Sequence, residues 1–238
     1  MRSCVLACMV AASVAGCDGA SSSGTPLFPL EAGREWTYQV TTRWDDDNQD
    51  VDIRTLRTLG EDDRAGERAW HRRDDAGIDY WLRHDATGIW RVAAKSDADA
   101  EPQADPASGP QRRYVLKTPA VVGAQWSAPT TLYLFKRRAE FPPELKYKHP
   151  SVPMNYTVES ADEAVDTPAG RFEHCIKVHG QANVRVYADS VGGWKDLPVD
   201  TYEWYCPGIG LVRLERHERA NSTFLLGGTL SMELTQWR

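Results

Sequence analysis

Histidine and cysteine side chains are the first candidates for chemistry in this sequence. The six histidines are His71, His84, His149, His174, His179 and His217. The closest pair, His174 and His179, has an odd spacing that puts the two rings on opposite faces of a strand, which is wrong for sharing a metal ion. We therefore predict no metal site. Two alternatives stay open: a site of His179, His217 and a carboxylate across neighbouring strands, and a Cys175 nucleophile beside His174 or His179.

No recognised catalytic or cofactor motif is present in the sequence. It has no Gly-x-Ser-x-Gly nucleophile turn, no His-Glu-x-x-His zinc motif, no phosphate-binding glycine loop and no dinucleotide fingerprint. We therefore expect no catalytic residues and no cofactor, and we do not expect an enzyme.

The five cysteines fall into three groups. Cys4 and Cys8 lie in an apolar N-terminal segment, Cys17 follows that segment, and Cys175 and Cys206 lie far along the chain. In an exported protein the last two could form a disulfide. The geometry leaves a question, because cysteines on strands separated by an intervening strand would be about 10 Å apart, beyond the usual Cα separation of roughly 7 Å. A Cys175–Cys206 bond requires a strand order that brings them together.

The N-terminal segment has the features of a signal peptide. Arg2 supplies a positive charge, the stretch from Cys4 to Ala15 is apolar, and small residues precede Cys17. The apolar stretch is too short for the roughly 20 residues that span a bilayer. We predict that residues 1–16 are a signal peptide.

The four residues Val14-Ala15-Gly16-Cys17 resemble the lipobox of bacterial lipoproteins, in which an aliphatic residue and two small residues precede a cysteine. The resemblance implies that Cys17 carries acyl chains such as palmitate after removal of residues 1–16. The protein would then be anchored to the inner or outer membrane of the cell envelope and face the periplasm. Asp18 resembles a signal that retains some lipoproteins in the inner membrane.

Charge and composition limit the classes of partner. The formal net charge is −6, and removal of Arg2 with the signal peptide makes it one unit more negative. A nucleic-acid binder needs clustered Lys and Arg, so we exclude nucleic acid as a partner. The apolar content of 41% is sufficient for a core. After a Ser- and Gly-rich tether at 17–26, we expect a single β-rich domain at 27–238.

The first half of this body is predicted to be a series of short strands. In residues 36–44 the side chains of Trp36, Tyr38, Val40, Thr42 and Trp44 alternate with polar ones, which indicates a half-buried strand. Further strands are expected at 51–59, 67–73, 78–83 and 88–93, separated by turn residues. Two segments without periodicity, near 96–111 and 136–153, are expected to be loops.

The sequence also contains a weak internal repeat. The stretch 118–126 has the same Pro, Gly and Trp spacing as 28–36, and each places a glycine three residues before a tryptophan that begins a strand. A basic, aromatic stretch at 146–150 could contact anionic lipid or a partner, but an ordinary solvated loop explains it as well.

Strands resume from Asn155. We expect one at 172–179 with Phe172, Ile176 and Val178 on one face, another at 184–188, and two joined by a Pro-Gly turn at 201–212. A last hairpin is expected from 222–226 and 229–237, turning at Gly227-Gly228.

Three motifs resemble a broad group of exported, mostly uncharacterised bacterial proteins. They are Phe-Pro-Leu-x-x-Gly-x-x-Trp-x-Tyr at 28–38, Thr-Pro-Ala-Gly-x-Phe-x-x-Cys at 167–175 and Pro-Gly-x-Gly-Leu-Val at 207–212. The resemblance implies an all-β, mainly antiparallel fold, with a single curved sheet forming an incomplete barrel or barrel-like meander and few or no helices. It supplies no catalytic residues.

Two functions remain open from the sequence. The first is a non-enzymatic, membrane-anchored lipoprotein that binds a protein partner or acts as a scaffold at the membrane surface. The second is a carrier that holds a lipid or another apolar ligand in the concave face of the sheet. Trp36, Trp44, Trp126 and Trp204 have the parity of core positions. A packed interior would favour the scaffold, and an unfilled cavity would favour the carrier.

Overall fold

A computed structural model describes residues 26–64, 66–106, 112–137, 151–189, 193–220 and 225–238. Throughout these ranges the regular elements are β-strands, and none of them contains an α-helix. Accordingly, the described residues include no helix long and apolar enough to cross a membrane. The lipobox with Cys17, most of the tether and the basic stretch 146–150 lie outside the described residues. The expected all-β class is confirmed.

The long strands form two antiparallel meanders of matching design. In the first, each strand pairs with the next in the order β1 (Glu35–Trp44), β2 (Gln49–Arg64), β3 (Glu67–Asp74), β4 (Asp79–Asp85), β5 (Gly88–Lys95) and β7 (Arg113–Lys117). In the second, the order is β8 (Gln125–Thr131), β10 (Ser151–Thr167), β11 (Gly170–Asp189), β12 (Gly193–Cys206), β13 (Gly210–Glu218) and β15 (Gly228–Trp237). Three two-residue strands, β6 (Gln103–Ala104), β9 (Lys136–Arg137) and β14 (Leu225–Leu226), complete the described elements.

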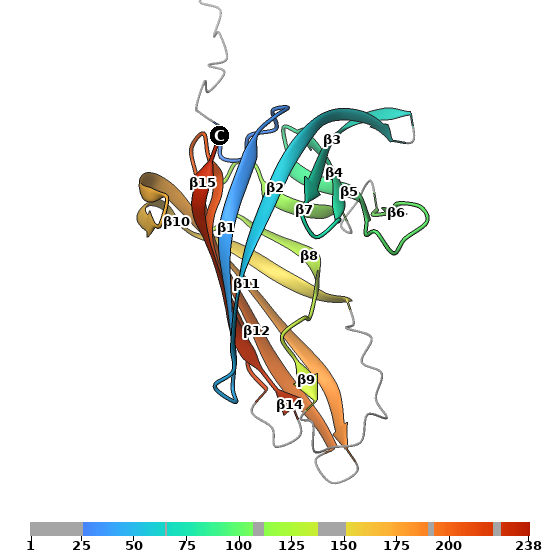
Figure 1. The fold of residues 1–238 in the computed structure, drawn as a ribbon, viewed down its shortest axis with the longest axis vertical. Helices are drawn as coiled ribbons and strands as arrows, with labels where there is room; N and C mark the ends of the chain where they lie inside the picture. Colours follow the sequence, from blue (N-terminus) through green and yellow to red (C-terminus); the bar gives the residue numbers. More distant parts are fainter. Residues whose placement is uncertain (1–25, 65, 107–111, 138–150, 190–192, 221–224) are drawn as a thin grey trace, which may run out of the picture.

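The two meanders join into one curved sheet that does not close. Antiparallel pairing between β1 and β15 connects them. At the two free ends of the sheet, β7 and β8 lie side by side without forming a ladder in the described residues. The strands curve around a common interior (Figure 1). The expected incomplete barrel is confirmed, whereas a single domain over 27–238 stays a prediction.

The weak sequence repeat corresponds to a structural one. Gly33 and Gly123 both adopt left-handed backbone conformations, with φ of 83° and 87°. Gly33 N donates to Thr58 O on the second strand of its meander at 2.8 Å, and Gly123 N donates to Val158 O at 2.9 Å. The pairing register shifts just after Thr58 and just after Val158. A left-handed glycine thus sets the start of each meander at the same point relative to its partner strand.

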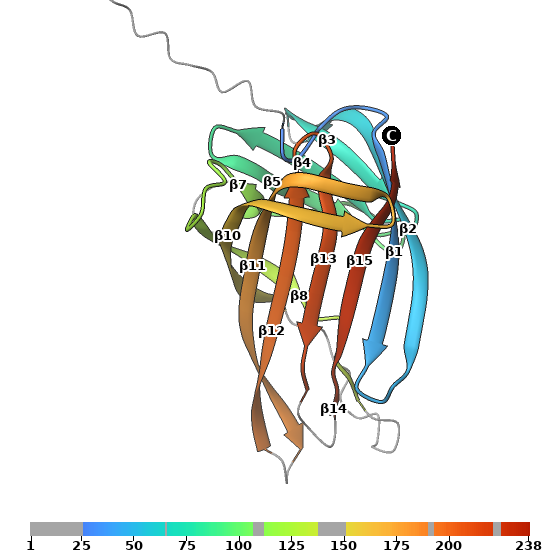
Figure 2. The ribbon, with the colours of Figure 1, turned by 90° about the vertical axis from the view of Figure 1, so that its left-hand side faces the viewer.

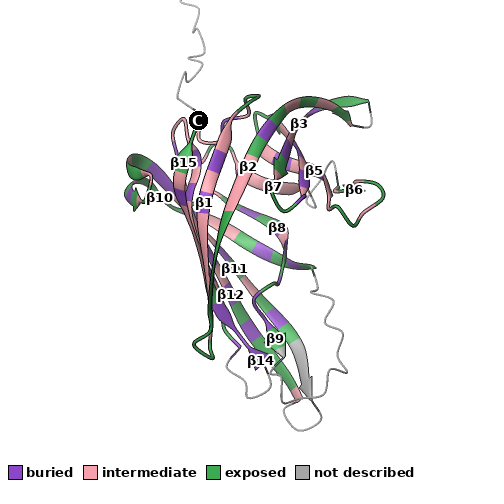
Figure 3. Cartoon of the chain, in the orientation of Figure 1, coloured by how far each residue is buried: buried purple, intermediate pink, exposed green. Residues whose placement is uncertain are grey.

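Burial alternates along the strands, as the period-two pattern predicts (Figure 3). Trp36 and Trp126, at equivalent positions of the two meanders, are both buried. Trp44 and Trp204 are only half-buried, so the expectation that all four tryptophans are core residues is correct for two of them. The strands expected between 36 and 93 are all present, although β2 extends well beyond its expected end.

Two expectations for the second meander are wrong. The stretches 172–179 and 184–188 belong to one continuous strand, β11. Gly180 is not a strand breaker, because its missing side chain makes room for Thr201, Tyr156 and Met154, all within 2.8 Å of where a Cβ would lie. Phe172 packs with Cys175 instead of sharing a face with Ile176 and Val178, because the register between β10 and β11 shifts and His174 has a φ of 58°.

The expected C-terminal hairpin is also wrong. The short strand β14 pairs with β9, and β15 pairs with β13 and β1. Gly227 and Gly228 are packed against backbone, with Glu218 O and Arg43 O within 2.6 Å of a built Cβ. These glycines therefore allow close backbone packing where a hairpin turn was expected.

The tip of the β10–β11 hairpin folds back across β12, β13 and β15 (Figure 2). Ala169 N donates to Leu234 O at 3.0 Å, and Trp204 Nε1 donates to Glu163 Oε2 at 2.8 Å. At the base of this tip Cys175 and Cys206 form a disulfide. The cysteines lie on directly paired strands with a Cα separation of 4.1 Å, which resolves the geometric question.

Replacing both cysteines by serine is expected to lower the free energy of unfolding by about 3 to 4 kcal/mol, because the disulfide restricts a loop of about 30 residues in the unfolded chain. Denaturant unfolding of Cys175→Ser/Cys206→Ser against the oxidised parent measures this change. Labelling of both thiols in unfolded, unreduced parent protein would contradict the bond.

Candidate functional site

Among the described residues, His179 and His217 do not form a metal site. His179 lies between two carboxylates, with Nδ1 at 2.7 Å from Glu159 Oε1 and Nε2 at 3.0 Å from Asp200 Oδ1. His217 is separated from it by the ring of Tyr202, on which His179 stacks. Within the described ranges no group of three His, Cys, Asp or Glu side chains could hold a metal ion. His179 is therefore held by hydrogen bonds on both ring nitrogens.

The described thiols are not available as nucleophiles either. Cys175 and Cys206 are fully buried in their disulfide. His174, which the sequence placed beside Cys175, points to solvent and bonds to Asp162 at 2.7 Å. The Cys175 nucleophile considered from the sequence is excluded by the disulfide, and Cys17 lies outside the described residues.

The main candidate site is a cavity inside the incomplete barrel. One lobe of about 290 Å³ is lined by five aromatic rings (Phe28, Tyr80, Tyr114, Tyr156 and Tyr205), aliphatic side chains including Leu56, Leu82, Val115, Leu211 and Leu214, and four charged groups (Arg72, Arg91, Arg113 and Glu203). A second lobe of about 270 Å³ shares Phe28, Leu56, Arg72, Tyr80, Val115, Tyr205 and Leu211. It extends to Trp36, Tyr38, Met232 and the charged residues Arg54 and Asp74. The shared residues make the two lobes one site.

Both meanders contribute to this cavity, and they contribute different groups. The three arginines of the first lobe come from β3, β5 and β7 of the first meander. Glu203, Tyr205 and Tyr156 come from β12 and β10 of the second. Because β7 and β8 lie side by side, the two ends of the sheet approach each other next to the cavity, and both strands contribute to its lining.

Arg72 is the most deeply buried charge in the lining, with an exposed fraction of 5%. Its Nε donates to Thr58 Oγ1 at 3.1 Å and its Nη2 donates to Pro29 O. The guanidinium also lies over the rings of Phe28 and Trp36, at 4.3 and 4.5 Å from their centroids. Burial lowers the pKa of Arg72 to about 10, so the group is still charged at neutral pH.

The other two arginines share one carboxylate. Arg91 binds Asp105 with two hydrogen bonds, of 2.5 and 3.1 Å, and Arg113 Nη1 lies 3.9 Å from the same carboxyl group. Burial and the neighbouring Arg91 charge lower the pKa of Arg113. One aspartate is therefore shared by two guanidinium groups on this wall of the cavity.

Glu203 is the acidic group that lines the first lobe, and Asp74 lines the second; burial raises the pKa of Glu203. The Tyr205 hydroxyl donates to Glu203 Oε2 at 2.5 Å, and Arg216 lies close enough to act on the same carboxyl group; both favour the charged form but do not outweigh burial. Burial likewise raises the pKa of Tyr156, of Tyr38 and of Tyr205. These hydroxyls therefore remain protonated hydrogen-bond donors inside the cavity.

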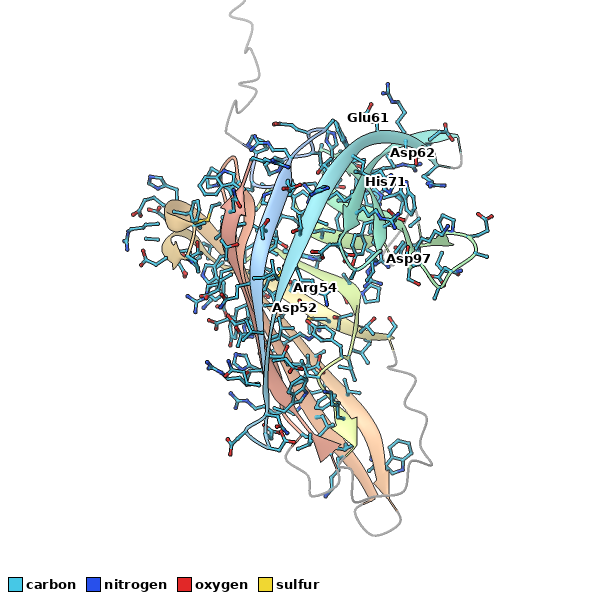
Figure 4. All side chains as sticks on the ribbon, viewed as in Figure 1. Asp52, Arg54, Glu61, Asp62, His71 and Asp97 are labelled. Atoms are coloured by element: carbon cyan, nitrogen blue, oxygen red, sulfur yellow. A yellow bond between two sulfur atoms is a disulfide. The ribbon has the colours of Figure 1, made fainter. Side chains whose placement is uncertain are left out.

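Several polar groups on β2, β3 and β4 are paired with one another. Figure 4 labels Asp52 and Arg54 on β2, and Arg54 Nη2 contacts Asp52 Oδ2 at 2.7 Å. Farther along the same strand, Asp62 accepts from Trp81 Nε1 at 3.1 Å, a bond that lowers the Asp62 pKa. His71, also labelled, stacks on Trp81 and bonds to Asp79 at 2.8 Å. These groups support the strands around the cavity.

The arrangement is suited to binding a small molecule. Within the described residues no histidine or cysteine lines either lobe. The cavity combines apolar walls with a few fixed polar groups, as small-molecule sites do. Sequence analysis missed Arg72 and Glu203, because a charged residue in an alternating strand is indistinguishable from an ordinary solvent-facing one. The aromatic part of the lining consists of tyrosines and Phe28 more than of tryptophans.

Part of the chain matches a known protein family. Residues 152–225 match a family described as DUF3108-like. This segment covers most of the second meander, including Glu203, Tyr205 and the disulfide, but not the cavity arginines. No curated protein matches the chain.

Two crystal structures share similarity over nearly the whole chain. One is a candidate lipoprotein from Parabacteroides distasonis, with 16% identity over 90% of this chain and 99% of the other, and a TM-score of 0.38. The other is a candidate exported protein with a YmcC-like fold from Bacteroides fragilis, with 17% identity over 89% and 98%, and a TM-score of 0.38. The chain is similar to exported, β-rich bacterial proteins, and nothing about a ligand follows from this similarity.

Glu203→Gln is expected to stabilise the protein at neutral pH. Burial raises the pKa of Glu203 on folding from its ordinary value of 4.5. Such a carboxyl group contributes its full share of the folding stability at a pH below 4.5. That contribution is lost as the pH rises through the pKa of the folded state. The difference in unfolding free energy between variant and parent should therefore grow above pH 4.5, by up to about 1.4 kcal/mol per pH unit, and then level off. Denaturant unfolding from pH 4 to 8 measures it. The exposed Glu101→Gln serves as control, and a difference independent of pH would refute the prediction.

Proposed function

We propose that this protein is a non-enzymatic binding protein of the bacterial cell envelope that carries a small, largely apolar ligand inside its incomplete barrel. The observation that carries the proposal is the two-lobed cavity between the meanders. Of the two functions left open by the sequence, an unfilled cavity supports the carrier.

The size and lining of the cavity support this proposal. Protein interiors are close-packed, and a void removes contacts from every atom around it. A lobe of about 290 Å³ has the volume of roughly ten water molecules at about 30 Å³ each. Space of this size next to aromatic and aliphatic side chains is suited to a small apolar ligand.

The seam between β7 and β8 supports a route into the cavity. These strands contribute Arg113, Tyr114 and Val115 on one side, and Ala128, Pro129 and Thr130 on the other. Since no ladder joins them in the described residues, they can separate without breaking strand pairing. A ligand could thus enter while the remaining ladders of the sheet stay intact.

A scaffold function is the second candidate. Val51, Ile53 and Leu59 are exposed on β2, with exposed fractions above one half. Exposed apolar side chains on a strand can bind a protein partner. This stripe supports binding on the outside of the barrel, whereas the cavity supports binding inside it.

Filling the cavity tests the carrier. Val115 lines both lobes, so Val115→Trp is expected to weaken ligand binding at least 10-fold by occupying the space. Native mass spectrometry of protein from the bacterial envelope measures a co-purifying small molecule. Val51→Trp, at an exposed position of β2, is the matched control and should retain it. No bound small molecule in the parent, or equal retention by both variants, would contradict the carrier.

The anchor is tested separately at Cys17. We expect acyl chains on this thiol to hold the protein at the membrane, since stable anchoring requires more than one chain or signal. Cys17→Ser should therefore move the protein from the membrane fraction to the soluble fraction. Membrane association that persists in washed vesicles of this variant would refute the lipid anchor.

A further inference from the structure

Arg72 is a buried cation without an acidic partner. In the described residues its hydrogen bonds go only to the neutral oxygens of Thr58 and Pro29, and the ionisable groups that act on its pKa are the phenols of Tyr38 and Tyr205, with no carboxylate among them. Buried charges in proteins are normally paired, because an isolated one has lost its hydration. The rings of Phe28 and Trp36 offset part of this cost by cation–π attraction. The guanidinium lines both lobes of the cavity.

A second buried arginine of the same chain shows what a compensated site looks like. Arg216 is 4% exposed, and its Nε donates to Glu218 Oε1 at 2.7 Å. Arg216 also donates to Thr130 Oγ1 and Thr131 O, at 3.1 and 3.0 Å. Arg72 is as deeply buried but lacks the carboxylate. The difference lies in their surroundings, since Arg216 is packed among protein groups and Arg72 faces a cavity.

The whole lining has an excess of positive charge. Arg91 and Arg113 share Asp105, which leaves one of these two charges uncompensated. Glu203 on the opposite wall and Asp74 in the second lobe are the two acidic lining residues, against four arginines, which are Arg54, Arg72, Arg91 and Arg113. The chain as a whole is acidic, with a net charge of −6. The cavity therefore has the opposite sign to the molecule that surrounds it.

We propose that the ligand is an amphiphilic anion, whose apolar chain fills the lobes and whose carboxylate or phosphate group binds Arg72. This proposal rests on the carrier function and names the class of ligand. Hydrogen bonds between a guanidinium and an anionic oxygen are about twice as strong as neutral ones, and they gain further strength away from water. The acidic group would supply the partner that Arg72 lacks.

Ten-carbon probes of different charge test this assignment. The lobe volume of about 290 Å³ suits about ten methylene-sized groups. Titration of full chain carrying Cys17→Ser with decanoate, decanol and decyltrimethylammonium, followed by calorimetry, compares an anion, a neutral molecule and a cation. Decanoate is expected to bind about 10- to 100-fold more tightly than decanol, and the cation least.

The failures of the two proposals are distinguishable. Equal affinity for decanoate and decanol would overturn the anionic class while the carrier function stands. Absence of binding by all three probes would overturn both.

Substitution of Arg72 links the preference to this residue. Arg72→Met keeps the length of the side chain and removes its charge, so decanoate should bind 10- to 100-fold more weakly while decanol changes less than about threefold. Arg57→Met, at an exposed position paired with Glu35, is the matched control and should leave both affinities unchanged. Thermal unfolding of each variant without probe shows that it is folded. A folded Arg72→Met that still prefers decanoate would overturn the assignment.

The source of the acidic group is resolved by two phosphate probes. Decyl phosphate binding at least as tightly as decanoate supports a lipid-derived phosphate monoester, and decanoate binding more tightly supports a fatty acid; both belong to the proposed class. Inorganic phosphate is expected not to displace decanoate at equal concentration. Displacement at equal concentration would overturn the amphiphile and identify a site for small free anions.

Discussion

The buried ion pair of Arg216 and Glu218 fixes the shape on which the cavity depends. Glu218 is fully buried and accepts hydrogen bonds from the backbone N–H groups of Tyr133 and Leu134. Arg216 reaches Thr130 and Thr131 at the end of β8. In the order of the sheet, β8 lies four strands away from β13, which carries Arg216 and Glu218. The ion pair therefore connects the edge strand β8 to β13 across the concave side of the sheet. A buried pair costs desolvation energy unless its hydrogen bonds are complete, and here both partners are well supplied.

Most of the strands could be predicted from the sequence, because a half-buried strand leaves a period-two pattern of apolar residues. The alternation from Trp36 to Trp44 located β1, and the Pro-Gly turn located the junction of β12 and β13. The errors concern pairing partners and close packing. Leu225 and Leu226 look like part of a hairpin, yet they pair with β9. Gly180 looks like a break, yet it makes room for three side chains. Which strand a segment pairs with, and what packs against a glycine, is determined by residues that are distant in the sequence.

The candidate site could not be predicted to the same degree. The two described cysteines could be paired on grounds of export and number, and the structure supplies the direct strand pairing that the sequence could not. Arg72, by contrast, follows His71 and precedes Arg73, and nothing local distinguishes a cavity-facing arginine from its exposed neighbour. Glu203 and Tyr205 are two residues apart on a strand, so their side chains point to the same face of the sheet. This spacing is the one feature of the local sequence that indicates that the two polar groups lie together. Their function depends on the other meander, which is distant in the sequence.

The matching starts of the two meanders point to duplication of an ancestral six-stranded unit. After such an event each copy can diverge independently, so the inward face of one could gain arginines while the other gained a glutamate. Substitutions in either copy can then change the lining of a cavity between the copies. The glycine turns that start each unit need not change. Relatives that keep these turns but differ in the cavity wall would be expected to hold chemically different ligands within one architecture.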